Sequence, residues 1–286
     1  MKGTREFTFT EKNTHEGKPN EDCFAVSSGG CYVVADGATR SRKKNGEYPE
    51  LSARLAADAF CESALSAYHS DNSIPSAFYR ANCAIKEVNR ENRITYETTD
   101  YLQNDFLACV GALGMLTGKF PYELHYGFIG DCGILVYDKE LMPIVLSENQ
   151  LGIMEQFRDQ WGFGENLDAQ KLFWRKEMRN KAIRRMTYGS LTGEETALCY
   201  VRTGSLKLEL GDTVLFFSDG ILPFIYDRWF RKILRHDFRE KHGEKFIGIL
   251  TRFIARLGQR PGASGIANLD DDKTLIAVSI LENSDV

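Results

Sequence analysis

Two apolar runs of this chain stop abruptly at an Asp-Gly pair. Cys31–Ala35 leads into Asp36-Gly37, and Thr213–Ser218 leads into Asp219-Gly220. Runs of β-prone residues that stop at a turn dipeptide are typical of buried strands that end at a loop. Asp-Gly is also an ordinary turn, so a single ending of this kind indicates no more than a turn. Two such endings favour carboxylates gathered at one edge of a sheet, where they can bind a hard metal ion.

The residues before the first Asp-Gly pair predict a β-hairpin. Cys23–Val26 and Cys31–Ala35 are short apolar runs on either side of Ser27–Gly30, a pattern typical of two strands and a glycine-containing turn. Asp22 precedes the first strand and Asp36 follows the second. Because the two ends of an antiparallel hairpin lie side by side, we expect these two carboxylates to be neighbours.

Two more strands carry carboxylates at their ends. The alternating run Tyr122–Ile129 leads into Gly130-Asp131, and the apolar run Thr274–Leu281 follows Asp270–Asp272. Three consecutive aspartates before a buried strand are costly unless water or a cation neutralises them. Asp212, in the Gly211-Asp212 turn, is interpreted as a turn residue only.

Periodicity predicts the remaining elements. Apolar residues recur at helical spacing over 50–69, 72–88, 226–238 and 244–257. Alternating or continuous apolar runs predict further strands at 5–10, 106–116, 198–202 and 206–210.

The composition limits the class of protein. The chain has 286 residues, of which 43% are hydrophobic and 27% charged, a balance typical of one large or two small soluble domains. A net charge of −4 gives no basic footprint for nucleic acid. No apolar stretch approaches the ~20 residues of a membrane span, and the polar N-terminus is unlike a secretory signal. The seven scattered cysteines indicate reduced thiols, so we expect a cytoplasmic monomer.

Two further features have alternative interpretations. His125 lies in an alternating run without a second histidine at ligand spacing, which favours a residue on a strand face over a metal ligand. Residues 147–190 contain a basic cluster, which is either a solvated helix face or a mobile flap beside a site for an anionic substrate. The cluster comprises Arg175, Lys176, Arg179, Lys181, Arg184 and Arg185.

The acidic strand ends suggest a chemistry. Carboxylate, carbonyl and water oxygens suit Mg²⁺ or Mn²⁺ better than zinc, and two such ions can activate water and stabilise charge at a phosphoryl centre. The sequence has no nucleophile-elbow, Walker or dinucleotide-binding motif. The residues alone leave open a metal site for hydrolysis and a set of scattered turn aspartates. The candidates are Asp22, Asp36, Asp131, Asp219 and one of Asp270–Asp272.

The ordered motifs resemble those of the metal-dependent type 2C serine/threonine protein phosphatases, in particular bacterial members. The resemblance extends from about residue 7 to residue 281 and depends on the order of the motifs. They are Asn20–Asp22, Val33–Gly37, Gly130–Cys132, Tyr188–Gly193, Gly211–Gly220 and Asp271–Thr274. It implies an α+β fold, an α-β-β-α sandwich of two antiparallel sheets with helix pairs on the outer faces. It also implies a single domain over 1–286, with a flap insertion at 149–187.

The resemblance also implies two Mn²⁺ or Mg²⁺ ions and a third, weaker one. By matched position, Asp36 would bridge the first two ions, the Gly37 carbonyl would bind one of them, and Asp219 and Asp271 would complete the first ion. A metal-bridging hydroxide would then attack the phosphorus of phosphoserine or phosphothreonine in a protein substrate. Asp36 and Asp219 are therefore the predicted catalytic residues.

The same resemblance assigns the other acidic residues. Asp22 and Glu21 would hold waters of the second ion, and Asp131, with Asp219, matches the place of the third ion.

The chain departs from the family pattern near the substrate phosphate. Family members usually carry an arginine shortly before the Glu-Asp pair, whereas this chain has Lys18, a point charge without a bidentate fork. The family's Asp-Gly is usually followed by Gly-Gly or by His, whereas Ala38–Ser41 follows here. Lys18 and Arg40 are the predicted phosphate-binding residues, with Arg42 as an alternative to Arg40.

Three functions are consistent with the sequence. The first is a Mn²⁺/Mg²⁺-dependent protein phosphatase whose partner is a phosphorylated protein. The second is a non-catalytic module that binds a phosphoprotein or another partner and retains the fold. The third is a phosphatase for a small phosphorylated molecule.

Overall fold

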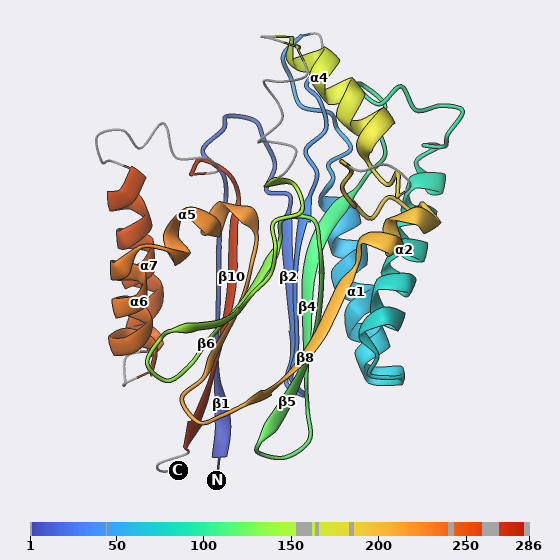
Figure 1. Cartoon of the computed structure of the whole chain (residues 1–286). Coiled ribbons are helices and arrows are strands. Elements are labelled where there is room, and N and C mark those ends of the chain that lie inside the picture. Colours follow the sequence, from blue (N-terminus) through green and yellow to red (C-terminus); the bar gives the residue numbers. More distant parts are fainter. Residues whose placement is uncertain are drawn as a thin grey trace.

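The protein folds into two antiparallel sheets that face each other, with helices on both outer faces (Figure 1). The computed structural model describes residues 2–43, 45–152, 162–163, 166–182, 186–239, 243–258 and 269–282. The layers follow the order helix, sheet, sheet, helix. This arrangement confirms the α+β, four-layer fold predicted from the sequence.

The first sheet has the strand order β1-β10-β9-β6-β7. Its two central partners, β9 and β10, pair in antiparallel register from Leu275 opposite Phe217 to Ser279 opposite Thr213. The strands of this sheet are β1 (Lys2–Glu11), β6 (Gly133–Tyr137), β7 (Pro143–Leu146), β9 (Thr213–Phe217) and β10 (Lys273–Glu282).

The second sheet has the order β2-β3-β4-β5-β8. Its first two strands form the predicted hairpin, with Asp22 directly opposite Asp36. The strands are β2 (Asp22–Ser27), β3 (Cys31–Gly37), β4 (Cys109–Thr117), β5 (Tyr122–Ile129) and β8 (Arg202–Leu208).

Long helices cover the outer face of each sheet. Helices α1 (Arg54–Ser70) and α2 (Ile74–Glu91) pack on the second sheet, and α2 begins with a Ser73 cap and a proline in its first turn. Helix α7 (Gly243–Gly258) covers the first sheet together with shorter helices. Those are η4 (Asp219–Ile221), α5 (Leu222–Ile225), α6 (Arg228–Ile233) and η5 (Leu234–Arg239). None of the described helices is long and apolar enough to span a membrane.

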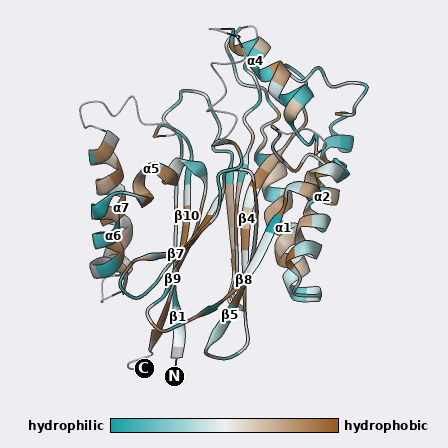
Figure 2. Cartoon of the chain, in the orientation of Figure 1, coloured by the Kyte–Doolittle hydropathy of each residue, from teal (hydrophilic) through white to brown (hydrophobic). Residues whose placement is uncertain are grey.

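Three clusters of buried apolar side chains separate the four layers. One lies between α1, α2 and the second sheet, one between the sheets, and one between the first sheet and α5–α7. Figure 2 shows the inner strands β4, β9 and β10 mainly in hydrophobic brown. The sheets are therefore fixed on both faces, and the loops at their strand ends are held in defined positions.

One predicted strand is wrong. The apolar run at 198–202 begins in the second half of a 3₁₀ helix, η3 (Glu195–Tyr200), and ends at Arg202, where β8 begins. The run is too short to distinguish a strand from a helical turn, and Ala197 and Tyr200 fill the core from the helical turn. The predicted core thiols are confirmed at Cys23, Cys31, Cys61, Cys109 and Cys132, all of which are buried and free.

The predicted flap region, 149–187, is described only in part. Its described residues include helix α4 (Leu167–Phe173), which continues into a π-helical turn, η2 (Trp174–Met178). Figure 1 shows α4 at the top of the sandwich, the end at which β2 begins and β3 ends. Arg184 and Arg185 of the predicted basic cluster lie outside the described residues.

Candidate metal centre

The β2–β3 hairpin places Asp22 and Asp36 at the same edge of the second sheet. The two residues are direct partners in the register, and the Gly37 amide donates to the Glu21 carbonyl across 3.1 Å. The hairpin therefore brings Glu21, Asp22, Asp36 and Gly37 together, as the sequence predicted.

Ser218 joins this edge to the first sheet. Its hydroxyl donates to Asp22 Oδ2 at 2.7 Å, and its Oγ accepts the Thr274 amide at 2.9 Å. Ser218 is the last residue before Asp219, so this contact draws the end of β9 towards the hairpin. The role of Ser218 was not predicted from the sequence, although this residue directly precedes the second Asp-Gly pair.

Electrostatics show that the aspartates share one environment. Burial raises the pKa of Asp36 well above its usual range, and the charges of Asp22, Asp219, Asp131 and Asp271 raise it further. Asp36 nevertheless retains some solvent-accessible surface. The structure thus brings four of the predicted ligands around Asp36, in a place that solvent can reach.

Asp22 and Asp219 respond in the same way. Burial raises the pKa of Asp22 to about 7, against the lowering effect of hydrogen bonds from Ser218 and Thr274. Burial, followed by the charges of Asp131 and Asp271, also raises the pKa of Asp219. A hydrogen bond with Asp36 lowers it in part. Like charges packed this closely favour the protonated form or a bound cation.

The carboxylates of Glu21 and Asp22 each have one buried oxygen that lacks a hydrogen-bond partner. Glu21 Oε1 accepts from the Ser52 hydroxyl and the Ala53 amide, both at 2.9 Å, whereas Glu21 Oε2 accepts nothing. Asp22 Oδ1 is likewise buried without a partner. Unsatisfied buried oxygens are rare in native proteins and often indicate an absent water or ion.

Asp271 and Asp272 have different roles. Asp272 accepts from the Asn13 amide and side chain and from the Glu21 amide, so it fastens the N-terminal loop beneath the hairpin. Asp271 is more exposed and accepts from Lys18 Nζ at 2.6 Å. Burial would lower the pKa of Lys18, but the bond to Asp271 and the charges of Asp271 and Asp272 raise it above its usual range.

The two predicted phosphate-binding residues differ in what their side chains contact. Lys18 Nζ lies at the edge of the aspartate cluster, where the charge of Asp36 also raises its pKa. The guanidinium of Arg40 is buried and donates to the carbonyls of Leu51 and Gln103 and to Asn104 Oδ1. A phosphate-binding role for Arg40 stays a prediction, and these contacts favour Lys18 over Arg40.

The glycines of the two Asp-Gly motifs permit close backbone approach. A Cβ on Gly37 would lie 2.7 Å from the Ala53 carbonyl, and a Cβ on Gly220 would lie 2.0 Å from the Asp272 carbonyl oxygen. Both obstacles are backbone atoms that cannot rotate away. The motif therefore needs glycine to pack each acidic strand end against its neighbour.

Substitution of Gly220 by alanine is expected to destabilise the protein by roughly 1–3 kcal/mol, the usual cost of overpacking. The Asp272 backbone would have to move, and the loop that carries Asp271 would move with it. Urea unfolding measures the effect. Gly152→Ala is the matched control, because the nearest atom to its added Cβ is 3.7 Å away. Equal stability of the two variants would contradict the close-packing argument.

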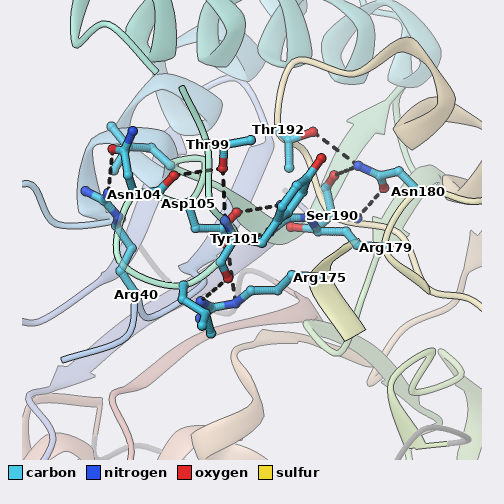
Figure 3. Close-up of polar contacts among 12 residues, drawn as sticks. Arg40, Thr99, Tyr101, Asn104, Asp105, Arg175, Arg179, Asn180, Ser190 and Thr192 are labelled. Carbon is cyan, nitrogen blue, oxygen red and sulfur yellow. Dashed lines mark hydrogen bonds and ion pairs between the residues drawn. The ribbon is translucent and has the colours of Figure 1, made fainter. Parts of the chain in front are cut away.

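At Arg175 and Arg179 the basic cluster is not a solvated helix face. Arg179 donates to both oxygens of Asp105, at 2.9 and 2.7 Å, and both side chains are almost fully buried. Arg175 Nε lies 3.2 Å from Asp105 Oδ2. Figure 3 shows the two arginines converging on this carboxylate. The interpretation as a solvated face is wrong for these two residues, because their partner lies about seventy positions away in the sequence. The interpretation as a flap stays a prediction.

Arg175 also reaches the loop after the first Asp-Gly motif. Its guanidinium donates to the Thr39 carbonyl at 2.9 Å and to Ser41 Oγ at 3.1 Å. No pattern in the sequence indicates this connection. The loop in which the chain departs from the family pattern is therefore held by the described part of the predicted flap region.

The Tyr188–Gly193 motif fastens the end of the flap to the second sheet. Leu191 exchanges both backbone hydrogen bonds with Cys109, at 2.8 and 3.1 Å, and Cys109 pairs with Gly37 across β3 and β4. Asn180 donates to the Ser190 carbonyl and accepts from the Ser190 amide, as Figure 3 also shows. This motif thus supports β4, the strand that pairs with the Asp36 strand β3.

His125 lies on the face of β5, as predicted. Its imidazole is partly exposed and lies 3.8 Å from Glu123 on the same strand. Asp212 also has the predicted turn role, because its carboxylate accepts the Glu209 amide at 2.8 Å.

The chemistry of the cluster fits a hard divalent cation. The donors are carboxylates, two of their buried oxygens are unsatisfied, and their crowding is relieved by positive charge. In the part of the chain that the structure describes, no three Asp, Glu, His or Cys side chains already form a set that could hold a metal ion. Binding an ion therefore requires these side chains to reorient.

Sequence comparison places the chain in a known family. A sequence model of protein phosphatase 2C matches residues 11–269, which is most of the chain. This chain belongs to the protein phosphatase 2C family. A search of curated protein sequences gave no match.

Solved phosphatase structures share the fold. The catalytic domain of the serine/threonine phosphatase PstP, in complex with two manganese ions, aligns with a TM-score of 0.59 at 15% identity, over 98% of this chain and 99% of that one. PppA of Pseudomonas aeruginosa aligns with a TM-score of 0.60 at 15% identity, over 97% and 98%. RsbX in complex with magnesium aligns with a TM-score of 0.53 at 10% identity, over 98% and 100%. At these identities the likeness establishes the protein phosphatase 2C fold.

Proposed function

We propose that this chain is a Mn²⁺/Mg²⁺-dependent phosphatase that hydrolyses phosphoserine and phosphothreonine in proteins. The observation that carries the proposal is the packing of Asp22 directly opposite Asp36, with the charges of Asp219, Asp131 and Asp271 close enough to raise the pKa of Asp36. A cluster of this kind is costly without a cation. Family membership supports phosphatase chemistry, and the manganese in PstP and the magnesium in RsbX support the choice of ions.

We assign the predicted ligands to this cluster. Asp36, the Gly37 carbonyl, Asp219 and Asp271 are proposed for the first ion, with Asp36 shared between two ions. Asp22 and Glu21 are proposed for the second ion, and Asp131 with Asp219 for a weaker third. When bound, such ions supply an activated water and stabilise the charge that develops on the phosphoryl group.

Residues of the chain itself prepare the cluster. Ser52 and the Ala53 amide bind one oxygen of Glu21, whose other oxygen is buried without a hydrogen-bond partner. Ser218 binds one oxygen of Asp22 in the same way. Such support restrains the orientation of these two carboxylates.

Lys18 is the proposed contact for the substrate phosphate. Its ammonium group pairs with Asp271 and lies near Asp36. If Asp271 turned to a metal ion, Lys18 would keep only its longer contact of 3.8 Å with Asp272 and could pair with a phosphate oxygen. As a point charge, it selects for phosphate geometry less strictly than an arginine fork does.

Hydrolysis of a phosphothreonine peptide is expected only in the presence of Mn²⁺ or Mg²⁺. The measurement is phosphate release at rising metal concentration, followed by removal of the metal with EDTA. We expect turnover that saturates with metal and is lost with the chelator. Turnover that is unchanged in EDTA would contradict the proposal.

The Lys18–Asp271 ion pair favours a second candidate, a non-catalytic module that binds a partner. At 2.6 Å it occupies a carboxylate that an ion would need. Thermal unfolding with Mn²⁺ separates the two functions. A rise in Tm without turnover on phosphopeptides or on small phosphate esters would favour the module, and turnover on small esters alone would indicate a small-molecule phosphatase.

A further inference from the structure

Four basic side chains of one helical segment converge on a hollow of about 240 Å³ in the outer layer of the first sheet. They recur at helical spacing along α6 and the start of η5, so they share one face. The turn between β6 and β7 forms the opposite wall, with Leu141 and Met142. The four residues are Arg228, Arg231, Lys232 and Arg235. We call this feature the basic hollow.

Cations outnumber anions in the described lining of the basic hollow, where Glu140 is the one acidic residue beside the four basic ones. Among the residues that the structure describes, none of the four cations forms an ion pair. Arg235 donates only to the backbone carbonyl of Glu140, at 3.1 Å, and the Glu140 carboxylate lies 3.6 Å from Lys139. The chain as a whole carries a net charge of −4. Four unpaired cations around one concavity therefore form a local site for negative charge.

Apolar side chains lie in and next to the hollow. Met142 lines it and is 58% exposed, and Trp229, which is 46% exposed, contacts two of its cations. Lys232 Nζ lies 4.3 Å from the centre of the Trp229 ring, and the Arg228 guanidinium lies 5.6 Å from it. Both cations are therefore close enough to the indole for cation–π attraction. Tryptophan and arginine are the residues that contribute most often to protein-protein binding energy.

The basic hollow is separate from the candidate metal centre. Asp131 precedes β6 and Glu140 follows it, so the two lie at opposite ends of a five-residue strand, about 17 Å long. The register agrees, because Gly133 pairs with Phe217, two residues before Asp219, and Tyr137 pairs with Thr213 at the far end. Figure 1 shows α6 beside α7 in the helical layer of the first sheet. A ligand in the hollow would not contact the aspartate cluster.

We propose that the basic hollow binds a short acidic segment of a partner protein. From Arg228 to Arg235 the helix rises about 10 Å, which is the length of about three residues of extended chain. An acidic segment with one apolar side chain would pair its carboxylates with the cations and place the apolar group on Trp229 or Met142. The concave shape favours a peptide over a flat membrane surface, and the site would hold a partner while the metal centre stays open.

Binding of a fluorescein-labelled Glu-Glu-Leu-Glu-Glu peptide, measured by anisotropy, tests this proposal. The probe is expected to bind the full chain and to weaken as salt rises, because screening reduces charge attraction. The Arg228→Glu/Lys232→Glu double variant is expected to bind at least tenfold more weakly. Both side chains are exposed, so the variant should retain the Tm of the original protein.

The matched control is Arg252→Glu/Arg256→Glu on α7. These arginines are also exposed, are also four residues apart, and do not line the hollow. We expect the control to bind within about twofold of the original protein, because neither arginine lines the hollow. The change in net charge is the same in both double variants, so a difference between them reports the position of the charge. Equal weakening in both variants, equal binding of a Gln-Gln-Leu-Gln-Gln peptide, or binding to phosphatidylserine vesicles without binding to the peptide would overturn the proposal.

Discussion

Substitution of Asp36 by asparagine is expected to abolish metal-dependent phosphatase activity and to stabilise the metal-free protein at the same time. The proposed activity depends on an anionic oxygen at this position, which a neutral amide does not provide. Loss of one preorganised electrostatic contact typically reduces turnover by about 10²–10³-fold, and we expect at least that for a ligand shared by two ions. Phosphopeptide hydrolysis at saturating Mn²⁺ measures the loss.

The expected gain in stability has a separate cause. Burial and four neighbouring aspartates raise the pKa of Asp36, so its ionised form is unfavourable in the folded, metal-free protein. Asparagine removes that charge with little change in volume. The Tm of the metal-free variant should therefore rise by a few degrees, while the Mn²⁺-induced increase in Tm should shrink.

Asp270→Asn is the control for both effects. Asp270 lies in the same acidic stretch as Asp271 but is exposed, and its backbone carbonyl rather than its side chain contacts Thr14. We expect this variant to retain activity and Tm. If Asp36→Asn retained full activity, the assignment of the metal centre would be wrong, and if it lowered the Tm of the metal-free protein, the charge-crowding argument would fail.

The parts of the candidate site that local patterns encode could be predicted from the sequence. The hairpin register that sets Asp22 opposite Asp36 follows from two apolar runs and a glycine-containing turn. Asp131 and Asp219 follow from the endings of their own strands. The fold class could be predicted only from the resemblance of the ordered motifs to type 2C phosphatases. Periodicity alone does not specify how the strands are divided between two sheets or how the sheets pack.

Long-range side-chain pairing could not be predicted. Asp105 gives no signal in the sequence, yet it binds Arg175 and Arg179, two residues of the basic cluster that charge patterning alone assigns to solvent. The strand expected at 198–202 is wrong for a related reason. A five-residue apolar run fits either a strand or a helical turn, and tertiary packing around Tyr200 decides between them.

The buried Asp105–Arg179 pair gives the prediction with the largest expected effect on stability. Arg179→Met is expected to destabilise the protein by about 3–5 kcal/mol, because removal of one partner leaves a charge buried and underpaired. Burial alone would lower the pKa of Arg179, but the charge of Asp105 raises it above its usual range, consistent with a tight pair. Urea unfolding measures the change.

An exposed pair provides the control for this variant. Arg90 Nη2 lies 2.7 Å from Glu87 on α2, and both side chains are more than half exposed. Arg90→Met should therefore cost less than roughly 1 kcal/mol. Equal losses for the two variants would show that burial does not determine the strength of the Asp105 pair.

Arg175→Met separates the stability of this pair from its connection to the metal centre. Arg179 still satisfies both oxygens of Asp105 in that variant, so the loss of stability should be smaller than for Arg179→Met. The bonds to Thr39 and Ser41 disappear, however, and the loop after Asp36-Gly37 is released. We therefore expect KM for a phosphopeptide to rise while the Mn²⁺-induced increase in Tm stays the same. A merely structural role would lower stability without changing KM, because the ordered loop matters for the substrate only if it borders the site where the phosphate binds.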